Sequence, residues 1–465
     1  MAFQKQGVSR RTAKMTEIDE VKDLIRKLTP ALGESARKLW YVYLLSENRT
    51  EREESLSLLR VLADKYAEED FRRSSHLPPP LIEKLPGSYE IGRVVYPGGD
   101  SPMGLGDSEM MKHILIVGMT GCGKTNTVFH LLKELARNGK PFLVFDWKRS
   151  YRDLKELPEL QNLKFIDVGA GNSDFRFNPL IPPPGTDPKH WLGLLIDVMS
   201  HAFFYGHGVE YFLREGIDEL YSVFGNYEGQ TEYPTFSDLR TLVQKRFVRG
   251  REMLWMSSVK RVLAALTEPA VLAETFNIRS ESVVAELLDS QVIIEMDDLP
   301  ALEKTFLIEA LMLWIYQFRK GQGRQPEFRH GIVLEEAHHV LSGAKESKLG
   351  QETIIEGVVR MIREFGEGVI VVDQEPSKLS KSIIANTNTK MCFNLGNGND
   401  VRVMSGSMFL TQEEEQAIDQ LKVGHAIVKL KDRFSDPIQV RVPLVEISSG
   451  IKSKTGNKTL GVGVP

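Results

Sequence analysis

Residues 113–125 read His-Ile-Leu-Ile-Val-Gly-Met-Thr-Gly-Cys-Gly-Lys-Thr, an apolar run that leads into the pattern G-x-x-x-x-G-K-T. The run is typical of a buried strand, and residues 126–138 have the apolar spacing of an amphipathic helix. Glycine lets the loop turn tightly with its amides facing inward, and the positive end of the following helix attracts the same anion. The stretch therefore predicts a phosphate-binding loop. A glycine turn that only joins strand to helix is the alternative, and the flanking elements argue against it.

The side chains of this loop predict its contacts. Lys124 is expected to reach the β- and γ-phosphates of a nucleotide, and the Thr125 hydroxyl to bind Mg²⁺. Asp146 ends the next apolar strand, where it either orients water or metal or is an exposed strand-end acid. The predicted nucleotide-binding set is Gly118, Met119, Thr120, Gly121, Cys122, Gly123, Lys124, Thr125, Asn126 and Asp146.

Composition sets the class of protein and its compartment. The chain has 465 residues, 42% of them hydrophobic, and a net charge of −4, which argues against a globally basic nucleic-acid coat. Its two cysteines are far apart in the sequence, so a disulfide framework is not expected. The N-terminus lacks the apolar core of a signal peptide, and no apolar run is long enough to span a membrane. A cytoplasmic protein without a membrane partner is predicted.

The chain divides at a proline-rich linker near residue 80. Residues 1–80 are expected to form a helical segment with a basic arm, with helical spacing over residues 17–73. Residues 81–447 are expected to form an α/β domain with a helical insertion at about 186–288. Residues 448–465 read as a glycine- and lysine-rich tail.

Within the α/β domain, strand-like runs alternate with helical ones, which predicts a largely parallel sheet. Turn-rich residues 97–100 are expected to follow the first strand. The strands expected at residues 426–430 and 438–442 are predicted to pair antiparallel. The predicted strands are residues 91–96, 142–146, 163–168, 292–296, 331–336, 368–374, 391–395, 426–430 and 438–442.

Hydrolysis of a nucleotide needs groups beyond the phosphate loop, and the sequence contains candidates. The run 331–336 ends in two acids. We assign Glu335 to Mg²⁺ and Glu336 to the attacking water, with solvated strand-end acids as the alternative. Gln374 ends another buried strand, where its amide would contact the γ-phosphate or the water.

Two arginines lie near the end of the helix that precedes the Gln374 strand. Arg363 is the preferred arginine finger acting on a neighbouring subunit, with Arg360 as the second choice; complementing the helix dipole is the alternative. His338 and His339 are expected to point apart on a helix, which favours a structural or coupling role over a metal site.

These blocks, in this order, resemble the HerA/FtsK group of ring-forming DNA-translocating ATPases, and are most similar to its HerA side. The resemblance covers residues 90–445. It implies a RecA-like P-loop sheet of the ASCE type, hydrolysis of Mg²⁺-bound ATP between subunits of a hexamer, and movement of double-stranded DNA, coupled to a nuclease or another effector. The motifs that carry it are residues 118–126, Phe145–Tyr151, Phe177–Leu180, Glu335–His338, Arg363–Gly366 and Gln374–Leu379.

Three departures from the group limit what is carried over. Glu335 stands where the group usually has aspartate, and Glu375 replaces an arginine. A helical segment occupies the place of the N-terminal β-barrel typical of the HerA side. The candidate pore-facing lysines, with solvated surface lysines as the alternative, are Lys345, Lys348, Lys378 and Lys381.

Two readings of function remain open from the sequence. The first is a motor that pumps DNA. The second is an ATP-dependent assembly or switch protein whose ring holds a partner enzyme, which the helical N-terminus favours. A small-molecule kinase fits the paired acids and the arginine turn less well.

Overall fold

The computed structural model describes residues 20–22, 24, 25, 28, 34–46, 49–74, 77, 81–96, 99–168, 175–279, 283–344, 352–434 and 436–447. The candidate lysines Lys345 and Lys348 lie outside these ranges, as do the first fifteen residues and the predicted tail. The chain forms two compact units, residues 1–78 with 95–100, and residues 79–94 with 101–465. Each unit is described by itself.

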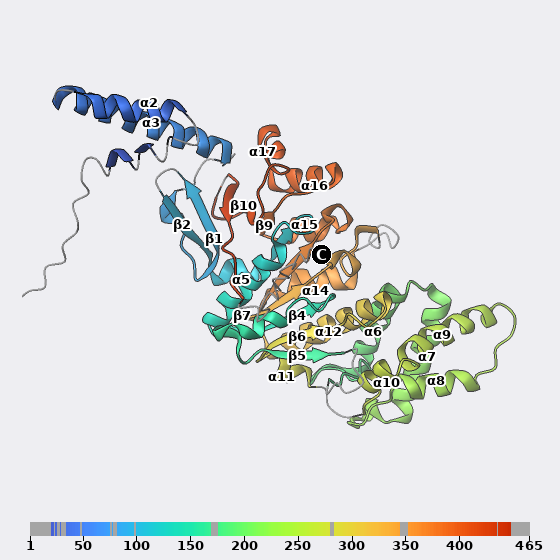
Figure 1. Ribbon diagram of the computed structural model, residues 1–465. Coiled ribbons are helices and arrows are strands. Elements are labelled where there is room, and N and C mark those ends of the chain that lie inside the picture. Colours follow the sequence, from blue (N-terminus) through green and yellow to red (C-terminus); the bar gives the residue numbers. More distant parts are fainter. Residues whose placement is uncertain are drawn as a thin grey trace, which may run out of the picture. The chain divides into compact units, whose positions relative to one another are not determined.

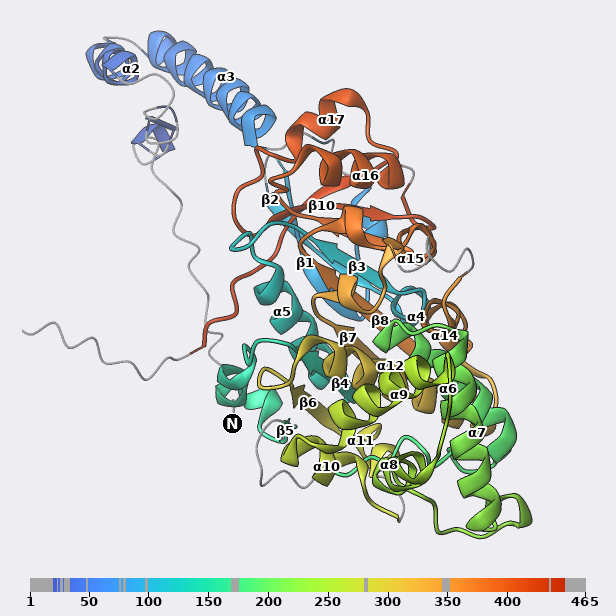
Figure 2. The same cartoon turned by 90° about the vertical axis from the view of Figure 1, so that its right-hand side faces the viewer.

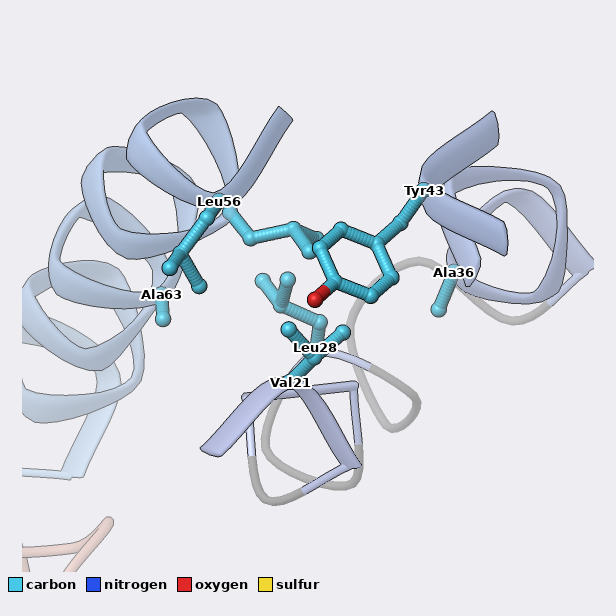
Figure 3. Packing of buried hydrophobic residues seen from close by; sticks show 7 residues of the cluster. Val21, Leu28, Ala36, Tyr43, Leu56 and Ala63 are labelled. Atoms are coloured by element: carbon cyan, nitrogen blue, oxygen red, sulfur yellow. The ribbon is translucent and has the colours of Figure 1, made fainter. Parts of the chain in front are cut away.

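The first unit is built on two helices, α2 (Glu34–Leu45) and α3 (Arg49–Ser74). They break at the polar turn around Ser46, whose hydroxyl donates to the Val42 carbonyl at 2.8 Å. Apolar side chains from both helices and from the residues before them pack together, as Figure 3 shows. This small core consists of Val21, Leu28, Ala36, Tyr43, Leu56, Leu59 and Ala63.

A mixed sheet forms the core of the second unit (Figures 1 and 2). In the described residues its order is β2-β1-β11-β10-β9-β3-β8-β7-β4-β6-β5. The strands from β9 to β5 are parallel, and β10, β11 and β1 continue the sheet antiparallel. The strands are β1 (Tyr89–Tyr96), β2 (Gly99–Leu105), β3 (Ile114–Val117), β4 (Phe142–Asp146), β5 (Lys164–Asp167), β6 (Gln291–Glu295), β7 (Gln325–Leu334), β8 (Phe365–Asp373), β9 (Thr389–Cys392), β10 (His425–Leu430) and β11 (Ile438–Arg441).

The position of β8 defines the class of this sheet. It lies between β3, which leads into the phosphate loop, and β7, which leads into the paired acids. The end of β8 therefore comes between the loop and the acids. This is the P-loop arrangement of the ASCE type, so the predicted fold class is confirmed.

Helices cover both faces of the parallel strands. Figure 2 shows α5 (Lys124–Arg137) on one side, with α12 (Ala301–Gln322) and α14 (Ile354–Ile362) on the other. Crossovers between parallel strands are right-handed. The chain moves along the sheet in one direction through α5 and in the opposite direction through α12 and α14, so these helices lie on opposite faces. Four further helices of the unit are α4 (Asp107–Met111), α15 (Lys381–Asn386), α16 (Gly398–Met408) and α17 (Gln412–Ala417).

The strand β2 was not predicted, and the turn expected at residues 97–100 is wrong at its end, where β2 begins at Gly99. Its proline and glycines are turn residues in most contexts. They are tolerated here because β2 is at the edge of the sheet. Gly104 is also required by close backbone contact, since a Cβ there would lie 2.5 Å from the Gly87 carbonyl oxygen.

Helices fill the chain between β5 and β6. They are α6 (Pro188–Phe203), α7 (His207–Val223), α8 (Phe236–Lys245), α9 (Glu252–Thr267), α10 (Ala270–Phe276) and α11 (Val284–Leu287). Buried Asn178 fixes the entry to this region, because its amide nitrogen donates to the carbonyls of Pro234 and Ile278 at 2.9 and 2.7 Å.

The aromatic residues of this region differ in burial. Phe203 contacts Phe306, with ring centroids 5.5 Å apart, and the Tyr205 hydroxyl donates to the Ile196 carbonyl. Phe204 and Tyr211, by contrast, are 53% and 59% exposed. Among the described residues, no helix is both long and apolar enough to cross a membrane.

Candidate nucleotide-binding site

The phosphate loop begins where buried β3 ends. Gly121 and Gly123 have φ angles of 80° and 114°, in the left-handed region that favours glycine. Gly118 is needed for space, because a Cβ there would lie 2.6 Å from both the Cys122 sulfur and the Phe393 Cβ. These local requirements let the chain turn tightly between β3 and α5.

Lys124 begins α5 and folds back over its own loop. Its ammonium group donates to the carbonyls of Gly118 and Met119 at 2.6 and 2.9 Å. Burial lowers its pKa, while the nearby charges of Glu336 and Asp373 oppose that shift. The ammonium group therefore lies at the loop, held by weak neutral acceptors that phosphate oxygens can replace.

The first of the two acids, Glu335, is buried directly after β7. One of its carboxylate oxygens accepts a hydrogen bond from the Tyr151 hydroxyl at 2.6 Å. Burial raises the pKa of Glu335 to about 7, and the neighbouring charges of Asp146 and Glu336 act in the same direction. The carboxylate is thus placed where a cation would stabilise its charged form.

The second acid, Glu336, has a φ of 46°, which turns the chain sharply after the strand. Its carboxylate is half-buried, forms an ion pair with Lys148 and accepts a hydrogen bond from the Gln374 amide nitrogen at 2.6 Å. The Gln374 amide oxygen accepts from the Thr120 hydroxyl, also at 2.6 Å. A chain of hydrogen bonds therefore joins the second acid to the phosphate loop.

Asp373, the last residue of β8, was not among the predicted site residues. It is buried and accepts from the backbone amides of His338 and Glu375 at 2.7 and 2.8 Å. Burial opposes its ionisation, but the His338 hydrogen bond and charge outweigh burial and hold the pKa of Asp373 below its usual value. The sequence signal for Asp373 is an apolar strand that ends in Asp-Gln. From the sequence, only the second of these residues, Gln374, was assigned a role in the site.

The two histidines do not point apart. The ring centroids of His338 and His339 are 4.2 Å from each other, because these residues form a short 3-10 turn (Ala337–His339) and not a regular helix. His338 bonds Asp373, and the His339 ring stacks on Trp147 at 4.5 Å. In the described part of the chain, no group of three or more His, Cys, Asp or Glu residues could hold a metal ion.

Asp146 is fully buried, so the exposed alternative is wrong. It accepts from the backbone amides of Lys148 and Ser150 at 3.0 and 2.8 Å. These bonds shape the turn from which Lys148 reaches Glu336. Asp146 itself does not line the cavity.

The site is a cavity of about 350 Å³. Of the predicted residues, it brings together Thr120, Gly121, Gly123, Lys124, Thr125, Asn126, Glu335, Glu336 and Gln374. Lys148, Ser150 and Asp373 also line it and had been given no role. Gly118, Met119 and Cys122 belong to the loop but do not line the cavity.

The donor set fits Mg²⁺ bound together with a nucleotide. The Thr125 hydroxyl and the Glu335 carboxylate line the same cavity and are hard oxygen ligands. Mg²⁺ usually takes few protein ligands and fills its octahedron with water and phosphate oxygens, so two such groups suffice.

The two arginines do not line the cavity of their own chain. Arg363 is exposed and caps the C-terminus of α14. Arg360 is exposed on that helix and pairs with Glu352 at 3.0 Å.

Comparison with known proteins shows which families this chain is similar to. Residues 89–312 match the family described as the central domain of helicase HerA. The DNA double-strand break repair helicase HerA of Saccharolobus solfataricus is 23% identical over 360 residues, which cover 74% of this chain and 66% of that protein. HerA of Sulfolobus acidocaldarius is 22% identical over 357 residues, with the same coverage. The chain thus spans slightly less than two thirds of the length of these relatives.

Solved structures share the fold. VirB4 of Thermoanaerobacter pseudethanolicus has a TM-score of 0.58 at 16% identity and covers 77% of this chain and 97% of its own. The plasmid coupling protein TrwB, in a complex with ADP and Mg²⁺, has a TM-score of 0.54 at 14% identity and covers 75% of this chain and 88% of its own.

Proposed function

We propose that this chain is a P-loop ATPase of the HerA/FtsK type, which hydrolyses ATP to move along double-stranded DNA; its similarity to the HerA central domain over residues 89–312 supports this. The working form is a ring, with a hexamer expected, and the motor acts with a nuclease or another effector. The observation that carries the proposal is the bonded series Thr120–Gln374–Glu336, which sets a carboxylate beside the phosphate loop.

The chemistry follows from the side chains of the cavity. Lys124 exchanges the loop carbonyls for β- and γ-phosphate oxygens and neutralises the charge that develops on them. Glu336 accepts a proton from the attacking water, and Gln374 orients that water through its amide. Lys148 balances the charge of Glu336 until the water is in place.

A bound Mg²⁺ would supply charge neutralisation at the phosphate oxygens. Thr125 and Glu335 would hold it, and Tyr151 would keep the Glu335 carboxylate in one orientation.

A complete site needs one more cation, supplied by a neighbouring subunit. Arg363 is exposed at the end of α14 and outside its own cavity, which suits a side chain that enters the next subunit's site. Arg360 is second, because its pairing with Glu352 would have to break.

The DNA contacts are proposed for polar lysine loops. Of the four candidates, Lys378 pairs with Glu375 at 2.6 Å, which weakens its case. Charge reversal at Lys345 and Lys348 tests the other loop. It should abolish the stimulation of ATP hydrolysis by DNA, and unchanged stimulation would remove those two lysines from the proposal.

Steady-state ATP hydrolysis with and without linear duplex DNA tests the motor. We expect strong stimulation by DNA, which falls with added salt because phosphate contacts release counterions. ATP hydrolysis that DNA does not change would contradict translocation.

That second result would support an assembly or switch protein whose ATP hydrolysis resets a complex. One observation favours this alternative. The helices α2 and α3 expose large apolar side chains, which on a protein surface mark partner contacts. They are Tyr41, Val42, Leu44, Leu45, Leu58 and Val61. Electron microscopy with a nonhydrolysable nucleotide would show whether rings form in either case.

A further inference from the structure

A second cavity in the ATPase unit is lined by lysines. It has a volume of about 400 Å³ and lies where α15, the start of β9, the end of β10 and α16 meet, elements that are labelled in Figure 1. Its cationic side chains are Lys381, Lys390, Lys429 and Lys431. No aspartate or glutamate of the described chain lines it.

Strand register puts these like charges on one face. Lys390 of β9 is directly opposite Lys429 of β10, so both side chains project from the same side of the sheet. Lys431 lies one residue beyond the end of β10 and lines the same cavity. Like charges directly opposite each other destabilise a sheet. An anionic ligand in the cavity would offset this repulsion.

Lys390 resembles the phosphate-loop lysine in its surroundings. It is 5% exposed, and its ammonium group donates to the Thr387 carbonyl at 2.6 Å. The ammonium group of Lys124 rests on the Gly118 carbonyl at the same distance. Each buried cation is held by a neutral backbone acceptor that an anion can displace.

Two further residues narrow the chemistry of the ligand. Asn388 lines the cavity and is 8% exposed, and its amide nitrogen is buried without an acceptor among the described residues. A buried donor without an acceptor destabilises the folded chain, and a ligand that accepts its hydrogen bond removes this cost. Phe409, also in the lining, is 79% exposed and has a φ of 58°. An exposed aromatic ring beside lysines is suited to stacking on a base.

We propose that this lysine cavity binds the phosphate of a nucleotide unit, with the base or sugar against Phe409. The unit belongs either to a nucleic-acid strand or to a free nucleotide. Without an acid in its lining, the cavity binds phosphate and does not hydrolyse it. The inference goes beyond the proposed function, because it assigns a second phosphate site whether or not the chain moves on DNA.

The test changes the two exposed lysines and leaves the strands intact. The variant is Lys381→Gln with Lys431→Gln in the full chain, and the matched control is Lys155→Gln with Lys189→Gln, exposed lysines far from this cavity in the sequence. The phosphate loop is first saturated with Mg²⁺ and a nonhydrolysable ATP analogue. Inorganic tripolyphosphate is then titrated by calorimetry. We expect its affinity to fall about tenfold in the variant and to stay within about twofold of wild type in the control.

Short linear duplex DNA is the second probe. If the source is nucleic acid, the slope of log affinity against log salt becomes shallower by about one to two units in the variant. Phe409→Ser should then weaken DNA binding and leave tripolyphosphate binding unchanged. If the lysine variant loses affinity for tripolyphosphate and keeps its affinity for DNA, the ligand of the cavity is a free nucleotide.

A loss of tripolyphosphate affinity in the lysine variant supports the site; a loss for DNA alone does not, because Lys381 is also one of the lysines proposed to contact DNA in the motor. Wild-type affinity for tripolyphosphate in the lysine variant, or an equal loss in the control, would overturn it. A failure of DNA to stimulate ATP hydrolysis would contradict the motor and leave the tripolyphosphate result standing.

Discussion

The two cavities of the second unit lie at opposite ends of the same strand, β9. At its carboxyl end, Asn394 accepts a hydrogen bond from the Met119 amide of the phosphate loop at 2.7 Å. At its amino end, Lys390 lines the lysine cavity. The first cavity combines lysines with Glu335, Glu336 and Asp373, whereas the second contains lysines without acids in its described lining.

In our proposals, the first cavity hydrolyses a nucleotide and the second only binds phosphate. Hydrolysis needs a proton acceptor as well as cations, and only the first cavity has one. The surroundings of the buried lysines reflect the same contrast. Glu336 and Asp373 oppose the lowering of the pKa of Lys124, whereas Lys431 adds to burial and lowers the pKa of Lys390 to about 8.

The largest expected effect comes from removing the proton acceptor of the first cavity. Glu336→Gln should slow single-turnover hydrolysis about a thousandfold while ATP affinity changes little, because an amide keeps the shape and cannot take the proton. The control is Glu413→Gln, an exposed acid on α17. Rapid-quench measurement of phosphate formation would show it. A wild-type rate in Glu336→Gln would contradict the role of Glu336 as the proton acceptor that distinguishes the first cavity from the second.

The next largest effect concerns the arginine that, in our proposal, a neighbouring subunit contributes to the first cavity. Arg363→Ala should slow ATP turnover about a hundredfold, and Arg360→Ala much less. Mixing Arg363→Ala with Glu336→Gln subunits should restore activity, because mixed interfaces join an intact acid to an intact arginine. If the mixture were no more active than either variant alone, the arginine would not act between subunits.

The third prediction concerns Glu335, an acid of the first cavity; the second cavity has no acid in its described lining. The pKa of Glu335 is raised to about 7, so the folded chain holds a proton that the unfolded chain loses near 4.5. This contribution to stability is complete below about pH 4.5 and is lost as the pH rises through 7. Glu335→Gln should therefore be more stable than wild type by up to about 3 kcal/mol at pH 8, without added metal, and similar at pH 4. Urea unfolding at both pH values measures the difference, and a constant difference would contradict the raised pKa.

The smallest effect tests the hydrogen bond behind that acid. Tyr151→Phe removes the hydroxyl that donates to Glu335 and keeps the ring against Phe129. The free energy of unfolding should fall by about 1 kcal/mol. Denaturant unfolding at neutral pH would detect it, with Tyr211→Phe, which is exposed, as the control. Equal effects in both variants would remove the special role of the buried bond.

Much of the fold could be predicted because its signals are local. The strand Phe142–Asp146 has the predicted bounds, and β10 and β11 pair antiparallel as expected. The edge strand β2 was missed, since proline and glycine in Gly99–Leu105 read as a turn unless the edge position is known. The proximity of His338 and His339 depends on a short 3-10 turn, which helical spacing does not reveal.

The cavity residues divide in the same way. The phosphate loop and the acids were found from contiguous motifs. The contacts from Lys148 to Glu336 and from Tyr151 to Glu335 join residues nearly two hundred positions apart. The lysine cavity depends on the register of Lys390 with Lys429, which the sequence of either strand alone does not contain.

The most direct measurement of the central claim is phosphate release from Mg²⁺-bound ATP by the wild-type chain and by Lys124→Ala. If the glycine-lined cavity is the site of hydrolysis, the wild type turns over ATP, and the variant is slower by about a hundredfold or more. Equal rates for the two proteins would contradict the assignment of this cavity.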